Sequence, residues 1–297
     1  MSFPGDGDGW VVCDLGHRHW GRHGAAGLLL YRRLPGQPDR TEVLLQHRAE
    51  WSHHGGTWGV LGGARGSAES VLDTALREAN EEATLSGRLT VDGQHDDEHG
   101  GWGYRTVLAQ ASAELVAEPA SAETVAVSWW QAEDVPALRL HPGFDASWPI
   151  LREALRPWHI VVDVANVMGA QPDGWWRDRA GAAERLIRRG EALAVAGLTR
   201  EQLDGVRLGE VLHRRWPRLT MVVEGAARPV ARRAFEHVRV VAASGSGDDA
   251  VLDEVLALEE QAVLVVTADR ELRGRAAAAG ANVIGPRWLL ERLPREG

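Results

Sequence analysis

The chain has 297 residues, of which 44% are hydrophobic and 25% charged, and its formal net charge is −9. This is the composition of a globular protein long enough for two domains. The single cysteine, Cys13, excludes an internal disulfide, and the absence of lysine excludes both a P-loop lysine and a Schiff-base lysine. No apolar run reaches the length of a membrane span and no signal peptide opens the chain, so we expect a cytoplasmic protein without a membrane partner.

The first part of the chain alternates strand-like and turn-like stretches. Residues 25–33 and 42–49 are rich in Leu and Val and predict two strands, and the glycine-rich stretch 55–63 predicts a turn. An acidic helix is expected over 69–83. Further strands are expected over 104–112 and 124–130, and a closing helix after them.

The second part of the chain has a different pattern of hydrophobic residues. Five stretches that are apolar on both faces predict buried parallel strands: 158–166, 219–225, 238–244, 262–269 and 281–286. Arg- and Ala-rich helical stretches separate them, which predicts a doubly wound α/β domain. We place the boundary near Pro157, giving domains 1–157 and 158–297. The first holds 13 arginines against 22 acidic residues and the second holds 20 of each, so the net negative charge lies in the first.

The predicted helix over 69–83 gathers acidic residues on one side. At about 100° per residue, Glu78, Glu81 and Glu82 fall within an arc of roughly 100°, beside an apolar face. Carboxylates this close raise one another's pKa, and a bound Mg²⁺ would relieve the repulsion. The alternative is an ordinary solvated acidic face.

The spacing around this helix favours the metal site, because it fits a long pattern, G-x(5)-E-x(7)-R-E-U-x-E-E-x-G-U. The matching residues are Gly63, Glu69, Arg77, Glu78, Ala79, Glu81, Glu82 and Leu85. This stretch resembles the Nudix box, and the resemblance extends over roughly residues 20–157. Two positions depart from the family pattern. Thr84 replaces the usual glycine, and Leu61 stands where many members have proline.

The resemblance implies a Nudix α/β/α sandwich with a mixed sheet, and hydrolysis of a nucleoside diphosphate linked to another group. It implies Mg²⁺ (or Mn²⁺) bound by Glu78, Glu82 and the Gly63 carbonyl. Arg77 would orient the carboxylates. Glu69 joins the catalytic candidates, with a structural role as the favoured alternative. The general base stays open among Glu81, Glu82 and three loop acids: Asp97, Glu98 and Glu123.

The surroundings of the box supply candidate contacts to a nucleotide substrate. We select His54, Trp58 and Arg65, since a tryptophan can stack on a base and a cation can contact phosphate. Core and turn packing is the alternative for each. Cys13, His17 and His19 suggest zinc, but they lack the paired spacing of a structural zinc site, so phosphate contact or plain surface is favoured.

Acidic residues follow three of the predicted parallel strands in the second domain. The motifs D-x-A-N-V at 163–167, G-D-D-A at 247–250 and T-A-D-R-E-L at 267–272 resemble the NYN branch of the PIN-like nucleases. The resemblance implies that Asp163, Asp249 and Asp269 bind Mg²⁺ or Mn²⁺, with Asn166 and Asp248 in support. Each acid could instead be a helix cap.

Arginine and tryptophan are neighbours in 173–179 and 213–218, and arginines cluster in 185–189. These stretches suggest a possible RNA-binding surface, with salt-bridged helix faces as the alternative.

The favoured function is a Nudix-type nucleotide pyrophosphohydrolase fused to a PIN-like domain. One alternative is a metal-dependent ribonuclease whose Nudix domain senses a nucleotide or a modified RNA end. Another is a regulator that binds nucleotides without turnover. The sequence leaves the oligomeric state open.

Overall fold

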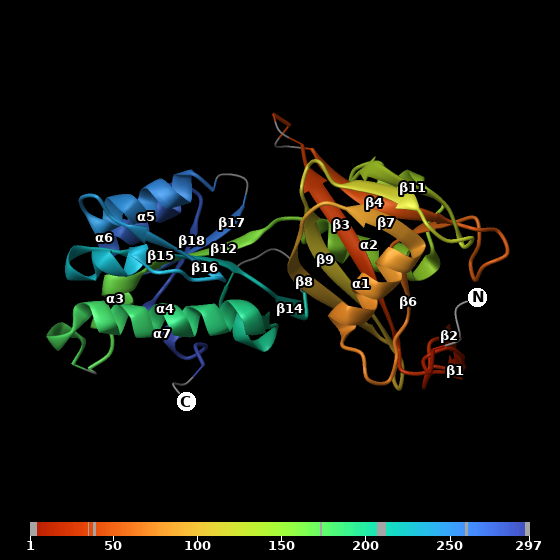
Figure 1. Ribbon diagram of the computed structural model, residues 1–297, viewed down its shortest axis with the longest axis horizontal. Helices are drawn as coiled ribbons and strands as arrows, with labels where there is room; N and C mark the ends of the chain where they lie inside the picture. Colours follow the sequence, from red (N-terminus) through yellow and green to blue (C-terminus); the bar gives the residue numbers. More distant parts are fainter. Residues whose placement is uncertain are drawn as a thin grey trace. The chain divides into compact units, whose positions relative to one another are not determined.

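The computed structural model describes residues 5–34, 36–37, 40–172, 174–206, 212–258 and 261–294. It divides the chain into two compact units (Figure 1). Unit 1 comprises Met1–Leu155 and Gly209–His213, and unit 2 comprises Arg156–Leu208 and Arg214–Gly297. No helix of the described ranges is both long and apolar enough to cross a membrane.

The centre of unit 1 is a mixed sheet with the strand order β11-β4-β3-β9-β8. The strands are β11 (Thr124–Gln131), β4 (Thr41–Arg48), β3 (Ala25–Arg33), β9 (Gly103–Ala111) and β8 (Leu89–Glu98). Strands β3 and β9 are parallel, and the other neighbours in this path are antiparallel. Two short strands extend the pairing: β5 (Trp58–Gly59) on β4 and β6 (Leu61–Ala64) on β3.

A helix covers each face of this sheet. Because successive side chains of a strand point to opposite faces, Leu28 and Leu30 of β3 pack with α1 (Val71–Glu82). Leu29 and Tyr31 of the same strand pack with α2 (Pro142–Glu153) on the other face. The mixed-sheet α/β fold expected of the first domain is therefore confirmed.

Helix α1 passes into a strand without a turn. Its N-cap is Ser70, whose side chain accepts a hydrogen bond from the Asp73 N–H. At the other end Ala83 is extended (φ −144°, ψ 138°) and begins β7 (Ala83–Ser86), which pairs with β10 (Val116–Pro119). Thr84 lies in this strand opposite Glu118. The position usually held by glycine therefore needs no left-handed backbone here.

A hairpin that the sequence analysis did not predict precedes the sheet. It joins β1 (Trp10–Val12) to β2 (Arg18–Trp20), and Gly16 takes the positive φ of 82° that the turn requires. The Asp14 N–H donates to the Gly100 carbonyl at 2.9 Å. This bond ties the hairpin to the turn between β8 and β9.

Unit 2 is built on a five-stranded parallel sheet with the order β16-β15-β12-β17-β18. The strands are β12 (Trp158–Asp163), β15 (Arg218–Val223), β16 (Val238–Ala242), β17 (Ala262–Val266) and β18 (Asn282–Ile284). Four of them lie within the predicted stretches, and β15 begins one residue before its predicted stretch. The chain order reverses between β12 and β17, which is where ligands bind in open sheets of this kind.

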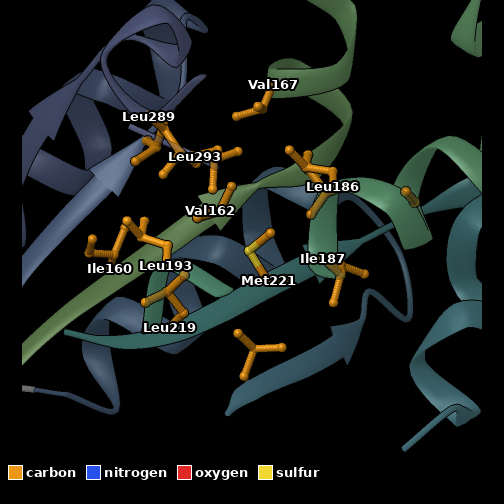
Figure 2. Packing of buried hydrophobic residues seen from close by; sticks show 14 of the residues in the cluster. Ile160, Val162, Val167, Leu186, Ile187, Leu193, Leu219, Met221, Leu289 and Leu293 are labelled. Atoms are coloured by element: carbon orange, nitrogen blue, oxygen red, sulfur yellow. The ribbon is translucent and has the colours of Figure 1, made fainter. Parts of the chain in front are cut away.

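Helices cover both faces of this sheet, as a doubly wound domain requires. Ile160 and Val162 of β12 pack against α3 (Val164–Gly169), α4 (Arg179–Ala196) and α7 (Pro286–Leu290), and Figure 2 shows this core around Met221. Val161 faces the opposite side, towards α5 (Gly247–Leu256) and α6 (Arg270–Ala278).

The remaining elements are short. In unit 2, β13 (Leu198–Thr199) pairs with β14 (Arg214–Arg215). The 3-10 helices are η1 (Val135–Ala137), η2 (Trp175–Arg177), η3 (Glu201–Leu203) and η4 (Gly225–Arg232).

Candidate functional sites

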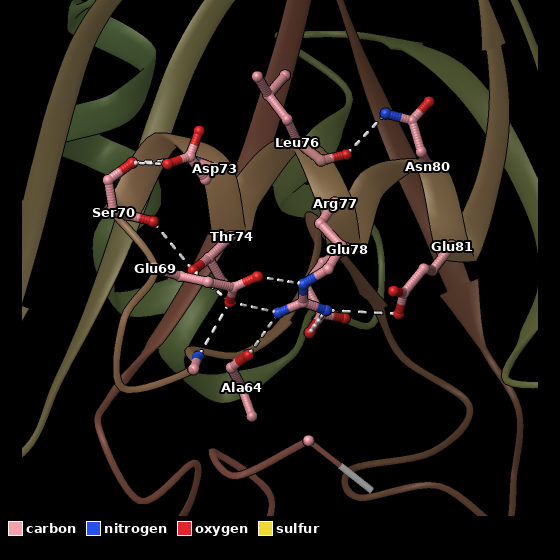
Figure 3. Close-up of polar contacts among 12 residues, drawn as sticks. Ala64, Glu69, Ser70, Asp73, Thr74, Leu76, Arg77, Glu78, Asn80 and Glu81 are labelled. Carbon is pink, nitrogen blue, oxygen red and sulfur yellow. Dashed lines mark hydrogen bonds and ion pairs between the residues drawn. The ribbon is translucent and has the colours of Figure 1, made fainter. Parts of the chain in front are cut away.

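Arg77 lies at the centre of the acidic face of α1. Figure 3 shows its guanidinium between Glu69 on one side and Glu78 and Glu81 on the other. Nε and Nη2 donate to the two oxygens of Glu69 at 2.6 and 2.8 Å. Nη1 donates to Glu78 at 2.8 Å and to Glu81 at 3.4 Å, and Nη2 also reaches the Ala64 carbonyl at 3.0 Å. One cation therefore fixes three carboxylates and ties the helix to β6.

Glu69 is held by hydrogen bonds on both of its oxygens. Besides Arg77, the Gly66 N–H and the Thr74 hydroxyl donate to it at 3.0 and 3.1 Å. The Arg77 guanidinium is the largest cause of a drop in the Glu69 pKa to about 2. This bidentate pair favours the structural alternative for Glu69, in which it positions Arg77.

Glu78 packs against the glycine strand β6. A Cβ built on Gly63 would overlap the Glu78 carboxylate, so glycine is the residue that fits there. Burial raises the pKa of Glu78, and the neighbouring Arg77 partly offsets that rise. The structure thus brings together the Gly63 backbone and a buried carboxylate, two of the predicted metal ligands.

Glu82 is 7% exposed and is the most buried acid of the helix. Gln46 Nε2 and the Gly62 N–H donate to its Oε2 at 2.8 and 2.7 Å, and Oε1 takes part in neither bond. Burial raises the Glu82 pKa to about 7. A buried carboxylate whose charge is this costly is suited to a cation. Glu81, by contrast, has a side chain that is 56% exposed.

A cavity of about 810 Å³ opens beside β6 and includes Gly62 and Gly63 in its wall. Four tryptophans line it: Trp10, Trp20, Trp51 and Trp102. His54 also lines it, with His53 and His141 at ring distances of 4.1 and 4.7 Å. The wall therefore offers several aromatic faces on which a base can stack.

Some of the predicted substrate-binding residues and candidate bases line this cavity, and others do not. Trp58 and Arg65 are not among the described residues that line the cavity. Trp58 packs edge-on against Trp130, and Arg65 Nε donates to the His23 carbonyl at 2.9 Å. Of the three acids predicted to lie in loops, Asp97 and Glu98 lie instead on β8. Asp97 and Glu123 line the cavity, whereas Glu98 pairs with Arg105.

The fold and this site define a class of protein. A mixed sheet between helices presents two buried carboxylates on α1, both against the glycine strand β6, next to a large aromatic cavity. Such a set of oxygen ligands suits a divalent cation and a phosphorylated ligand. The class is that of hydrolases acting on phosphate anhydrides.

Comparisons with known proteins identify the family. A model of the NUDIX domain matches residues 21–153. The protein "Putative 8-oxo-dGTP diphosphatase 3" of Mycobacterium tuberculosis is 52% identical over 160 residues, covering 50% of this chain and 71% of that protein. The chain therefore belongs to the Nudix family, and it is an enzyme of the nucleotide pyrophosphohydrolase type.

Two further matches each cover about half of the chain. A "Nucleoside triphosphate pyrophosphatase/Nudix hydrolase fusion protein" of Bifidobacterium longum is 42% identical over 146 residues, covering 48% of this chain and 30% of that protein. The crystal structure of RenU, a Nudix hydrolase of M. smegmatis, is 47% identical with a TM-score of 0.46, covering 50% of this chain and 94% of RenU.

In unit 2, polar side chains meet at the carboxyl ends of β12 and β17. Asp163, at the end of β12, accepts the Asn166 N–H at 3.0 Å and the Thr267 hydroxyl at 3.1 Å. Burial raises its pKa, and the charges of Asp248 and Glu224 add to that rise. Asn166 Oδ1 accepts the Ala268 N–H at 2.9 Å, which ties the two strand ends together.

The structure distinguishes the two adjacent aspartates of α5. Asp249 forms an ion pair with Arg275 at 2.7 Å. Burial raises the pKa of Asp248, and the nearby charges of Asp269 and Glu224 raise it further. Asp248 is therefore within electrostatic range of the other acids, while Asp249 has its own cation. Asp269 caps α6 by accepting the Leu272 N–H at 2.9 Å.

Glu224 is an acid that the sequence analysis missed. It follows β15 directly, and its carboxylate accepts the Gly247 N–H at the start of α5 at 2.9 Å. Its place after a parallel strand was a usable signal, because the carboxyl ends of all the strands share one edge.

The arginines of unit 2 are partly engaged in ion pairs. Arg188 lies 3.6 Å from Glu184 and 3.3 Å from Glu191, and Arg233 also pairs with Glu184. These contacts fit the salt-bridged alternative for the 185–189 stretch. Trp176 is 55% exposed, which leaves it open to stacking. Asp173, in the first Arg/Trp stretch, lies outside the described residues.

Proposed function

We propose that unit 1 hydrolyses the diphosphate linkage of a nucleotide and that it requires Mg²⁺. The observation that carries the proposal is the pair of buried carboxylates on α1, Glu78 against Gly63 and Glu82 against Gly62. Both have a raised pKa because they are buried. Glu78, Glu82 and the Gly63 carbonyl would hold the metal, with Glu81 at the solvent side.

Magnesium, when bound, would neutralise the diphosphate and activate or orient a water. The chain's own residues supply position. Arg77 fixes Glu78 and Glu81 relative to β6, and Glu69 fixes Arg77. Among the candidate bases, Glu123 is favoured because it lines the cavity, whereas Glu98 pairs with Arg105. Asp97 also lines the cavity, but its Oδ2 lies 3.1 Å from His99 Nε2.

We further propose a purine nucleoside triphosphate with an oxidised base as the first substrate to test. Two matched relatives are named as 8-oxo-dGTP diphosphatases, and each is 52% identical over the matched residues. The tryptophan-lined cavity would hold the base by stacking.

The test compares wild type with Glu82→Gln in Mg²⁺. The panel contains dGTP, 8-oxo-dGTP, ADP-ribose, NADH, a nucleotide sugar and a dinucleoside polyphosphate, with release of nucleoside monophosphate as the readout. Glu118→Gln, an exposed acid on β10, is the matched control. We expect release by wild type and the control but not by Glu82→Gln. Equal release by all three proteins would contradict the metal assignment.

A second candidate function is metal-dependent cleavage of RNA by unit 2. We propose it because burial raises the pKa values of Asp163 and Asp248 near the point where the strand order reverses, and the charges of Glu224 and Asp269 add to these rises. The two activities would then belong to domains 1–157 and 158–297. Labelled RNA with Mn²⁺ tests it. Wild type should cleave, Asp163→Asn should not, and Asp163→Asn should still hydrolyse nucleotide. The same RNA with a modified end tests the alternative in which unit 1 senses that end. Cleavage by unit 2 should then depend on the modification.

A further inference from the structure

Two turns of unit 1 bring together one cysteine and three histidines. Cys13 and His17 lie in the β1–β2 turn, His19 lies on β2, and His99 lies in the turn between β8 and β9. One ligand atom from each lies within 4.8 Å of all the others. His99 is distant in sequence from the other three residues. Cys13, His17 and His19 alone therefore gave the sequence analysis an incomplete set of metal ligands.

We propose that Cys13, His17, His19 and His99 form a structural Zn²⁺ site. Thiolate sulfur and imidazole nitrogen are the ligands that zinc selects, whereas the oxygen set on α1 suits magnesium. Four ligands is also the number that a closed structural zinc site uses. The proposal is independent of the activity proposed above.

The backbone holds the four residues in place. The Cys13 N–H donates to the His17 carbonyl at 3.0 Å, and the Gly16 N–H donates to the Cys13 carbonyl at 2.9 Å, which closes the first turn. The His99 N–H donates to the Trp102 carbonyl at 2.9 Å, which closes the second. The Asp14 to Gly100 bond joins the two turns. The ligands therefore come from a framework that exists without metal.

The side chains present unpaired ligand atoms inside the cluster. Cys13 is only 5% exposed. His19 Nε2 and His99 Nδ1 are buried and have no hydrogen-bond partner among the described residues. Buried polar atoms of this kind are rare unless something binds them. Two of them beside a buried thiol indicate a missing ligand rather than an ordinary surface group.

His99 also has the outer contact that metal-binding histidines make. Its Nε2 lies 3.1 Å from Asp97 Oδ2, so the carboxylate can accept the proton on Nε2 and leave Nδ1 free for a metal. His19 stacks on Trp102 with a ring distance of 3.9 Å, which fixes its plane. Two of the three imidazoles are thus oriented by neighbours.

The distances allow tetrahedral coordination after small side-chain movements. With zinc bonds of about 2.0–2.3 Å, tetrahedral ligand atoms lie about 3.3–3.7 Å apart. The 4.8 Å limit of the cluster exceeds this by roughly one ångström. Rotations of the exposed His17 side chain and of its neighbours can close that gap. Zinc would then pin the N-terminal hairpin to the β8–β9 turn and fix the tryptophans of the cavity wall.

The test measures metal rather than turnover. The full chain is expressed with added zinc, and bound metal is counted by mass spectrometry. We expect one zinc per chain in wild type. Cys13→Ser and His99→Ala should each lower zinc affinity at least tenfold, measured by competition with a chromogenic chelator. In the Co²⁺-loaded protein a thiolate-to-cobalt charge-transfer band should appear, and Cys13→Ser should abolish it.

A matched control uses the other histidine cluster of the same cavity, His53, His54 and His141. His54→Ala should keep the zinc and the cobalt band. Asp97→Asn keeps all four ligands, so it should fold and bind zinc with about 10–100-fold lower affinity. Absence of zinc from folded wild type would overturn the proposal. So would wild-type affinity in Cys13→Ser, or loss of zinc in His54→Ala alone.

Discussion

The two units each gather several carboxylates, but they place an arginine differently. On α1, Arg77 lies among the acids and bonds to Glu69, Glu78 and Glu81 at once. In unit 2, Arg275 pairs with Asp249 and so draws one acid out of the group. A cation that lies among the acids orients them before a metal binds. A cation that pairs with one acid only determines which of the other acids remain available.

The two groups also differ in how the chain builds them. The α1 acids are neighbours on one helix, so their spacing in the sequence sets their geometry. The acids of unit 2 come from the ends of separate strands and the start of a helix, so the parallel topology brings them together. The first kind of site can be recognised from a motif, while the second depends on the fold.

Substitution of the two arginines should give the largest contrast. Arg77→Gln leaves Glu69 and Glu78 without their cation, so we expect loss of about 10³ in kcat, as for removal of other transition-state-orienting groups. Arg275→Gln removes an exposed pair and should change neither nucleotide hydrolysis nor thermal stability. Steady-state kinetics and thermal unfolding check both variants. If Arg77→Gln keeps a tenth of the activity, the interpretation that this cation orients the acids is wrong.

A fall in pH should destabilise unit 2 through one buried histidine. His159 is buried on β12 beside Thr220, and burial lowers its pKa from 6.5 to about 4. The unfolded chain therefore binds more protons between these values. The free energy of unfolding is therefore highest above pH 6.5. It declines by at most about 3 kcal/mol as the pH falls towards 4. In unit 1 the ionised Glu69 continues to stabilise the fold at lower pH, because its pKa is lowered to about 2.

Hydrogen exchange at peptide resolution measures this loss on the full chain, after correction for intrinsic rates. Protection of β12 should fall between pH 6.5 and 4. His159→Gln should flatten the β12 profile, and His237→Gln, an exposed histidine, should leave it unchanged. An unchanged profile in His159→Gln would assign the effect to another group.

The third prediction concerns the glycine strand beside Glu78. Gly63→Ala introduces a methyl group that overlaps the Glu78 carboxylate, so that ligand must move. A displacement of this size costs about 10² in kcat. Gly274→Ala in α6 is the control, because a Cβ there meets nothing within 4 Å. Kinetics and circular dichroism should show lost activity with an intact fold for Gly63→Ala alone.

The smallest expected effect tests which aspartate of α5 belongs with the acids near the carboxyl ends of the unit 2 strands. Asp248→Asn should weaken Mn²⁺ binding to unit 2 about tenfold, a typical coupling of one charge to a metal. Asp249→Asn should leave it unchanged, since Asp249 is neutralised by Arg275. Calorimetry in a Glu82→Gln background isolates the second unit. Equal effects of the two substitutions would contradict the distinction.

Much of the fold was predictable because its signals are local. The strand at 25–33 and the helix with Glu78 and Glu82 follow from apolar patterning and acid spacing. The structure places Trp58 against Trp130 and Arg65 against a backbone carbonyl, because strand pairing and not composition decides which side chains face the cavity. His99 and Glu224 were missed, since each joins its group only through turns and strand ends that are remote in sequence.

The direct passage of α1 into β7 has a consequence for insertions and deletions. Glu82 ends the helix and Ala83 begins the strand, so no spare residue lies between the acid and the β7–β10 ladder. An added or deleted residue here would move every β7 side chain to the opposite face. It would also rotate Glu82 by about 100° if the helix absorbed it. Length variation among relatives should therefore avoid this junction.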